Sequence, residues 1–341
     1  MKLPKLALSI LSLSIVTRTF ACDLCGCYLP RQHFAEPKSF GLYAAVSEQF
    51  THFGTVQFND TEIDNPTGQY LDSSITQFVV GASFFDNRFA LQVNLPMIHR
   101  SYERPEGFEI ERGTESGIGD LSLVARFTVL RKEALFRASG GGGFEKDGKA
   151  ILGLTREPDF TASIDLFAGI KFPTGDSSRI KEEFSEIEVE GAPESGIHGH
   201  DLALGTGSYD AILGIQASVR YKAIYFEAGT QFTIRGDGRH SYHFANDLTW
   251  SAGPGVYLYR KDSRSLGLQC IVAGESKNTD RFQGRVAEDT GVTSLYVGPR
   301  ITAQFDRWSA DVGVDLPVIM NTTKLQTVPD YRIRGGISVH F

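Results

Sequence analysis

Three cysteines near the start of the chain have the spacing best suited to chemistry: Cys22, Cys25 and Cys27. Three thiolates placed this closely could bind a soft metal such as copper or zinc, with a fourth ligand from elsewhere. In an oxidising compartment two of them could instead form a disulfide or contact a partner. Cys22 could also be lipidated, because it follows the small residue Ala21. These alternatives stay open, and no cofactor is required by the rest of the chain.

Two histidine pairs are weaker candidates for a metal site. His198 and His200, with Asp201, could form one in a loop, and so could His240 and His243. Residues i and i+2 of an extended segment point the same way. The alternative for both pairs is a solvated loop. Cys270 stands alone in a predicted strand, where a cysteine serves as a small apolar residue.

Catalytic machinery is hard to find in the sequence. An outer-membrane lipid-modifying enzyme would need a nucleophile, a histidine base and an orienting acid near the membrane rim. There is no Gly-x-Ser-x-Gly motif, and strand histidines are scarce: His99 lies at a strand end and His340 next to the last residue. We predict that the protein is not an enzyme, and keep the lipid-modifying enzyme as an alternative.

The N-terminus is typical of a secretory signal peptide over residues 1–21. A short basic region precedes the apolar run Leu6–Val16, and Thr19 and Ala21 precede the cleavage site. The run is too short to span a bilayer, and no later stretch reaches the length of a membrane helix. Cleavage removes Lys2, Lys5 and Arg18 from 34 basic residues that stand against 41 acidic ones, which leaves a net charge of −10. This acidity argues against nucleic acid as a partner.

The remainder of the chain alternates in polarity with the period of a β-strand. The last segment, 331–341, carries an apolar set on one face, arginine and histidine on the other, and ends on Phe341. The pattern predicts strands at about 40–53, 74–85, 88–99, 119–130, 160–172, 208–221, 223–235, 250–260, 264–275, 293–305, 308–320 and 331–341. We therefore predict an all-β protein: a transmembrane, antiparallel, up-and-down β-barrel of twelve strands over residues 40–341, after a Cys-rich periplasmic segment at 22–39.

The connections between the predicted strands alternate between long and short. Long polar loops follow every odd strand, including 100–116, 177–207 and 321–330, while short turns such as Asp86-Asn87 and Asp306-Arg307 follow most even ones. Bacterial outer-membrane barrels have this arrangement, with short periplasmic turns and longer external loops. The connection 131–159 is the exception and is left without a role.

The alternation also sorts the charged residues of the strands to one face. A charge that faces lipid at mid-depth costs roughly 2–4 kcal/mol, so these side chains should point inward. We predict that six of them line the lumen and serve transport: Glu227, Arg300, Asp311, Asp315, Arg332 and Arg334. Because twelve strands enclose a narrow interior, such a mixed-sign network could fill much of it.

Several short phrases resemble one family. They are Ser116–Leu121, Phe172–Asp176, Leu204–Asp210 and Gly298-Pro299-Arg300. In this order they are similar to the outer-membrane transporter family named for the meta pathway of phenol degradation, over roughly 40–341; the cysteine segment lies outside that core. The resemblance implies uptake of small molecules, with aromatic or apolar compounds favoured. Read from the residues alone, these glycines and aspartates are those of strand ends and turns.

The sequence therefore predicts a porin-like outer-membrane channel or transporter of a Gram-negative cell, exported through a cleaved signal peptide. It would act in passive or facilitated uptake of small molecules. Its partners would be outer-membrane lipid, the small-molecule substrate, and the barrel-assembly machinery through the strand that ends in Phe341. The second alternative to this function is a non-conducting barrel whose Cys-rich N-terminus handles a metal or binds a partner.

Overall fold

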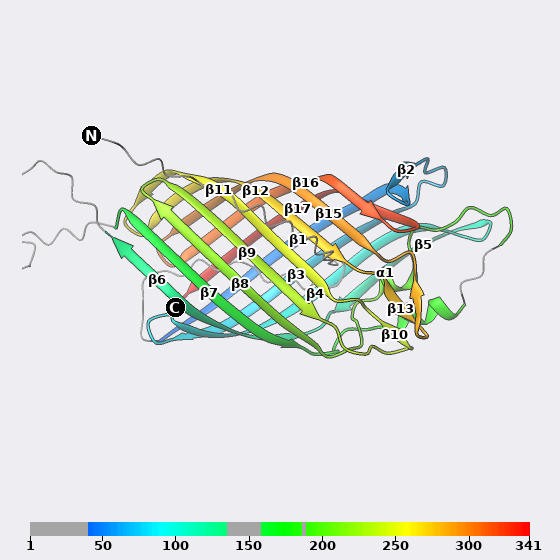
Figure 1. Cartoon of the computed structure of the whole chain (residues 1–341), viewed down its shortest axis with the longest axis horizontal. Helices are drawn as coiled ribbons and strands as arrows, with labels where there is room; N and C mark the ends of the chain where they lie inside the picture. Colours follow the sequence, from blue (N-terminus) through cyan, green and yellow to red (C-terminus); the bar gives the residue numbers. More distant parts are fainter. Residues whose placement is uncertain (1–39, 135–157, 186–188) are drawn as a thin grey trace, which may run out of the picture.

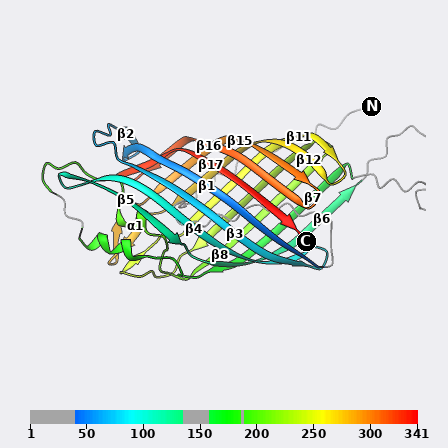
Figure 2. The ribbon, with the colours of Figure 1, turned by 180° about the vertical axis from the view of Figure 1, so that it is seen from behind.

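A computed structural model of the chain, which describes residues 40–134, 158–185 and 189–341, is a closed antiparallel barrel (Figure 1). Each strand pairs with the next along the chain, and β17 returns to pair with β1, with Tyr43 opposite His340. Figure 2 shows these two closing strands side by side. In the described residues the wall has twelve strands: β1 (Phe40–Phe58), β3 (Tyr70–Phe84), β4 (Phe89–Glu106), β6 (Ser122–Ala134), β7 (Phe160–Lys171), β8 (Asp210–Tyr221), β9 (Ile224–Ile234), β11 (Asp247–Lys261), β12 (Arg264–Lys277), β15 (Val292–Phe305), β16 (Trp308–Thr322) and β17 (Leu325–His340). The predicted fold class and strand number are confirmed.

The two faces of the wall differ as the alternation predicts. On β15, Ile301 and Phe305 are 49% and 54% exposed, whereas Tyr296 and Arg300 are 2% and 7% exposed. Exposed apolar side chains also cover the outer face of the other wall strands. An apolar surface of this extent is stable against lipid rather than water. In the described residues no helix has the length and apolar character needed to cross a membrane.

Short turns close one end of the barrel, where both ends of the barrel segment also lie (Figure 1). Lys222, Asp262 and Asp306 have φ between 52° and 54° and form the tips of two-residue turns, as hairpins of this length require. The predicted two-residue turn Asp86-Asn87 is wrong, because four residues, 85–88, separate β3 from β4. The predicted connection 131–159 begins in β6 and contains residues 135–157, which lie outside the described residues.

The other end carries small elements built from the predicted loops. The prediction of a long loop at 100–116 is wrong: β4 continues to Glu106 and pairs with β5 (Glu109–Ile118). The loop predicted at 321–330 is likewise strand, apart from Thr323-Lys324. Both segments, 100–116 and 321–330, alternate in polarity, but their outer faces are too polar to be recognised as lipid-facing strands. The remaining small elements are β2 (Thr61–Ile63), η2 (Ser178–Phe184), α1 (Gly199–Leu202), β10 (Tyr242–His243), β13 (Asp280–Phe282) and β14 (Arg285–Ala287).

Candidate functional site

The six charged residues predicted for the lumen lie on β9, β15, β16 and β17, on the face opposite the exposed apolar side chains. Arg300 Nε lies 3.5 Å from Asp311 Oδ2, and Arg334 Nε lies 3.1 Å from Asp315 Oδ2. Four of the six therefore meet on adjacent strands. Glu227 is also buried, but it stands on β9, which β11 and β12 separate from β15.

Arg332 pairs with a carboxylate that the sequence analysis did not select. Its Nη2 lies 3.6 Å from Glu275 Oε2 on β12, and its guanidinium carbon lies 3.9 Å from the centre of the Tyr296 ring. Glu275 occupies the last position of a predicted strand, and alternation alone could have placed it on the inner face. An arginine held between a carboxylate and an aromatic face is fixed in position.

A second buried network, which the sequence analysis missed, lies where the loop end of the barrel begins. Lys171 Nζ lies 3.0 Å from Asp120 Oδ2 and 2.7 Å from Asp210 Oδ2. Arg235 Nη1 lies 2.9 Å from the same Asp210 oxygen, and its Nε donates to Asp247 Oδ2 at 2.6 Å. All five side chains are at most 2% exposed. Removing one member would leave a buried charge without its partner, which is strongly destabilising.

Asp120 also joins the two ends of the long connection between β7 and β8. Its Oδ1 accepts from the Gly175 backbone N–H at 3.0 Å, and its Oδ2 accepts from the N–H and the hydroxyl of Thr206, both at 2.9 Å. A Cβ on Gly205 would lie 2.7 Å from Asp120 Oδ1, so this close approach requires glycine. Three phrases that carry the family resemblance thus meet at one carboxylate: Ser116–Leu121, Phe172–Asp176 and Leu204–Asp210.

The described parts of the connection that Asp120 holds, residues 172–185 and 189–209, pack against the inner wall at the loop end of the barrel; together we call them the mouth loop. Leu202 and Ile197 pack with Phe53, Leu71 and Tyr102 from β1, β3 and β4. On its other side, Ile180 and Ala203 form a cluster with three aromatic residues of the neighbouring loops: Tyr242, Phe244 and Phe282. The mouth loop is therefore buried on two sides, whereas the sequence analysis placed it outside the barrel.

Two arginines of β4 fix the mouth loop to the wall. Arg100 is fully buried, and its Nη1 donates to the backbone oxygens of Asp201 and Ala203 at 2.5 and 2.6 Å. Arg104 donates to Glu182 Oε2 at 2.8 Å. These are charge-assisted hydrogen bonds, which are stronger than neutral ones. Both arginines lie in the segment predicted as a loop, so their inward direction could not be read from the sequence.

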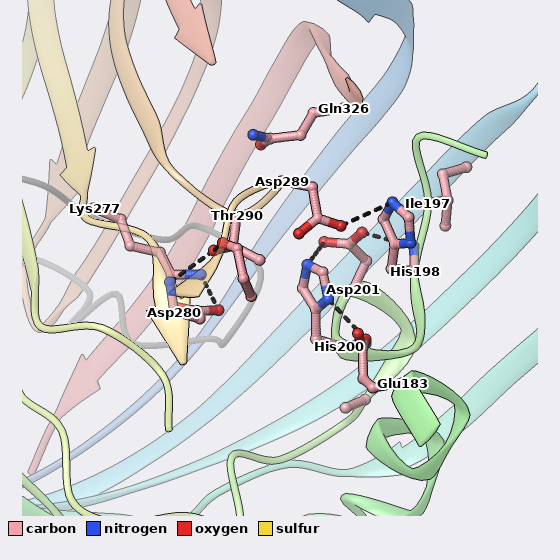
Figure 3. A network of polar contacts seen from close by, with 12 residues as sticks. Glu183, Ile197, His198, His200, Asp201, Lys277, Asp280, Asp289, Thr290 and Gln326 are labelled. Carbon is pink, nitrogen blue, oxygen red and sulfur yellow. Dashed lines mark hydrogen bonds and ion pairs between the residues drawn. The ribbon is translucent and has the colours of Figure 1, made fainter. Parts of the chain in front are cut away.

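The histidines of the mouth loop form ion pairs (Figure 3). His200 Nδ1 lies 2.9 Å from Glu183 Oε1 and its Nε2 lies 3.4 Å from Asp201 Oδ1, while His198 Nε2 lies 3.2 Å from Asp289 Oδ2. The two rings stack at 5.7 Å. Burial alone would lower the pKa of His200, but the carboxylates of Asp201 and Glu183 outweigh it and raise the pKa to about 10. His200 is therefore a cation that holds two loop segments together.

The structure gives no support to the metal sites considered for the loop histidines. Within the described residues, no group of three or more His, Cys, Asp or Glu side chains is arranged to hold a metal ion. His243 Nδ1 instead lies 3.2 Å from Asp237 Oδ1. The signal peptide at 1–21 and the cysteines Cys22, Cys25 and Cys27 lie outside the described residues, and the statements about them stay predictions.

His99, the histidine considered for catalysis, lies on the outer face of β4. Its Nδ1 is 2.5 Å from Ser116 Oγ on the paired strand β5. The contact that the described residues give His99 is with this hydroxyl, which makes a Ser–His pair; a triad would add a carboxylate that orients the histidine.

Comparison with known proteins supports the fold. No protein-family model matches the chain, and no curated protein sequence matches it. Among solved structures, an outer membrane channel from Pseudomonas putida F1 aligns with 92% of this chain and 100% of its own, at a TM-score of 0.58 and 13% identity. The beta domain of the Bordetella autotransporter Brka aligns with 89% of this chain and 100% of its own, at a TM-score of 0.43 and 8% identity. The likeness to the Pseudomonas putida F1 channel, together with the closed antiparallel wall, shows the fold: a transmembrane β-barrel of the outer-membrane type.

Proposed function

We propose that this protein is an outer-membrane channel for the passive or facilitated uptake of small molecules. The observation that carries the proposal is the pairing of a closed barrel with a polar interior, narrowed at one end by the mouth loop. The barrel supplies a path across the membrane without exposing backbone groups to lipid. No chemical step is required.

The interior favours solutes of modest size and no strong charge. Arg300, Asp311, Asp315 and Arg334 neutralise one another in pairs, so the wall offers little excess charge to attract an ion of either sign. The mouth loop further restricts the solutes that can enter. The preference for aromatic or apolar compounds rests on the family resemblance, and the channel role also agrees with the name of the similar Pseudomonas putida F1 protein.

Single-channel recording tests the proposal. We expect discrete conductance steps when the refolded full chain is inserted into a planar bilayer, with a current that scales with salt concentration. Heat-modifiable migration on a gel serves as the check that the barrel is folded. A folded barrel that stays silent in every salt would contradict the channel function.

The Ser116–His99 contact favours a second candidate, a lipid-modifying enzyme at the outer face. The pair is exposed at the edge of the apolar wall, next to the exposed Met97 and Ile118, where a lipid ester could approach it. Ser116→Ala is the decisive variant, because it removes the nucleophile and keeps the strand. Lipid hydrolysis by the wild type that the variant lacks would support the enzyme; equal lipid profiles would rule it out.

The N-terminal segment and the cellular partners complete the proposal. Export through residues 1–21 would place Cys22, Cys25 and Cys27 in the periplasm, on the side of the short turns. There they would bind copper or zinc, form a disulfide, or contact a partner. The strand that ends in Phe341 would be the segment presented to the barrel-assembly machinery. Metal content of protein purified under reducing conditions, compared with a triple Cys→Ser variant, tests the metal alternative.

A further inference from the structure

The strand β5 has a neighbour on one side only. It pairs with β4 without a register shift, from Glu109 opposite Glu106 to Ile118 opposite Met97. In the described residues no strand pairs with its other edge, and the other strands with a single neighbour, β2, β10 and β14, have two or three residues. The ten residues of β5 therefore present a long unpaired edge, on the hairpin that projects beyond the loop end of the barrel (Figure 2).

The hydrogen bonds of the hairpin show which backbone groups face this edge. Directly below β5, the Gly119 N–H donates to the Pro96 oxygen of β4 at 2.8 Å. Because the direction alternates along an antiparallel ladder, the odd residues of β5 bond to β4 and the even residues point away from it. Pro105, which lies opposite Ile110 and has no N–H to give, agrees with this alternation. The residues whose N–H and C=O groups face the open edge are Ile110, Arg112, Thr114, Ser116 and Ile118. Within the described residues, none of these backbone groups has a hydrogen bond to another segment.

The rest of the molecule leaves this edge open. The cover of the wall ends at Gly119, whose oxygen accepts from Thr174 Oγ1 at 2.9 Å, while the same Oγ1 accepts from the Leu121 N–H at 2.8 Å. Above that point the mouth loop lies behind β5, because a Cβ on Gly117 would be 3.0 Å from Leu204 Cδ1. The inner face of β5 is thereby covered, whereas every even residue of the strand is exposed.

The charged side chains of β5 between its two isoleucines are already paired within the protein. The ion pairs are Arg112–Glu103, Glu111–Arg104 and Glu115–Arg179, with N–O distances of 2.8, 2.7 and 3.4 Å. A strand laid against β5 therefore needs no charge of its own. On the outer face it would meet an isoleucine at each end and the hydroxyl of Thr114 at the centre. Directly opposed side chains of this kind favour β-branched partners.

The same strand of a second copy in the membrane does not fit this edge. All copies share one orientation across the membrane, and barrel strands are tilted by roughly 35–45°. Rotation of one copy about the membrane normal reverses the tilt, so two β5 strands would cross at roughly 70–90°. Antiparallel pairing along the whole edge would require one barrel to be inverted. A strand that covers this edge must therefore come from another molecule.

We propose that β5 is a docking strand, to which an extended, uncharged peptide segment of another protein adds as a further antiparallel strand at the cell surface. An unpaired edge is a template for such pairing, in which backbone hydrogen bonds give affinity and alternate side chains give specificity. The edge is held straight by the regular ladder with β4 and by the mouth loop behind it, so little order has to be gained on binding. The proposal does not depend on the channel function.

Amide hydrogen exchange tests the open edge itself. The full chain is studied in detergent micelles, with exchange followed residue by residue by NMR. Without a partner, the amides of the even residues from 110 to 118 should exchange much faster than those of the odd residues, which the ladder with β4 protects. Slow exchange of the even amides in the protein alone would mean that the edge is covered, and would overturn the proposal.

The docking itself is probed with the synthetic peptide Val-Ala-Thr-Ser-Thr-Ala-Thr-Ser-Val. Laid antiparallel to β5, it places valine opposite Ile110 and Ile118 and threonine opposite Thr114. At about 100 times its Kd, the peptide should slow exchange of the even amides about a hundred-fold and leave the odd amides unchanged. The control is the same peptide N-methylated at its threonines, which removes donors that face β5. Equal protection by the two peptides, or no protection at about 1 mM peptide, contradicts docking at this edge.

One substitution removes a donor of the edge and spares the ladder with β4. Thr114→Pro deletes an N–H that points away from β4, and a proline is tolerated on an edge strand. Thr114→Ala, which keeps the N–H, is the matched control. Loss of one hydrogen bond should raise the Kd of the peptide about ten-fold in Thr114→Pro only. Folding is checked by heat-modifiable migration and by protection of the Gly113 and Glu115 amides; a folded Thr114→Pro variant that binds the peptide as the wild type does would refute the docking strand.

Discussion

Replacing Arg100 by methionine should release the mouth loop from the wall of the barrel. The side chain is fully buried and donates to the backbone oxygens of Asp201 and Ala203. Methionine keeps most of the apolar stem and removes both donors. A hydrogen bond to a charged group contributes about 1.5–3 kcal/mol, so the docked loop should lose at least about 3 kcal/mol. At about 1.4 kcal/mol for each factor of ten, the docked-to-undocked ratio should fall about a hundred-fold.

Two assays read this shift. Limited trypsin digestion should cut at Arg179 or Lys181 in η2 faster in the Arg100→Met variant, and single-channel recording should show longer open times or a larger conductance. Arg112→Met is the matched control: Arg112 lies on the paired strand β5, its side chain is 73% exposed, and it contacts Glu103. Removal of such a surface pair costs about 0–1 kcal/mol. A folded Arg100→Met barrel with unchanged digestion and unchanged conductance would refute the role assigned to this arginine.

Three further perturbations have defined outcomes. Because the pKa of His200 is raised from 6.5 to about 10, its ion pairs stabilise the mouth loop fully below pH 6.5 and are lost as pH rises toward 10; trypsin digestion should accelerate over that range, and His200→Gln should remove the pH dependence. Arg334→Glu should raise the preference for cations over anions in reversal-potential measurements, whereas the exposed Arg264→Glu at the short-turn end should not. Asp120→Ala should leave Lys171 with one carboxylate fewer and lower the free energy of unfolding in urea by about 3–5 kcal/mol; a loss below about 1 kcal/mol, the range of a surface pair, would contradict its place in the buried network.

The strands could be predicted because their signal is local. Along β15, apolar and polar side chains alternate over the whole length, and the predicted range 293–305 differs from the observed Val292–Phe305 by one residue. The same alternation selected Arg300 and Arg334, whose inward direction follows from the cost of a charge in lipid. Where contact with lipid decides which way a side chain points, a single sequence is enough to predict that direction.

The mouth loop could not be predicted, because nothing local determines where it lies. The sequence predicts a loop around Arg100 and Arg104, because β4 and β5 rise beyond the apolar wall and their outer faces turn polar there. Once both faces of a strand meet polar surroundings, alternation of polarity no longer separates inside from outside. Besides Glu111, which is close to Arg104 in the chain, these arginines bind two backbone oxygens 101 and 103 residues away and a carboxylate 78 residues away. Contacts over such separations have no pattern in the sequence.

One signal for the mouth loop was nevertheless present. Taken one at a time, Gly119-Asp120, Thr174-Gly175-Asp176 and Gly205-Thr206 each have the composition of a separate turn. If each phrase were only a turn, its aspartate would accept hydrogen bonds from within that turn. Asp120 instead accepts from Gly175 and Thr206, which belong to the other two phrases. The glycines that permit this approach stand on both sides of a connection of more than thirty residues. Glycine and aspartate repeated at both ends of one long loop therefore indicate a loop that is tied back to the barrel, and thereby one that can narrow it.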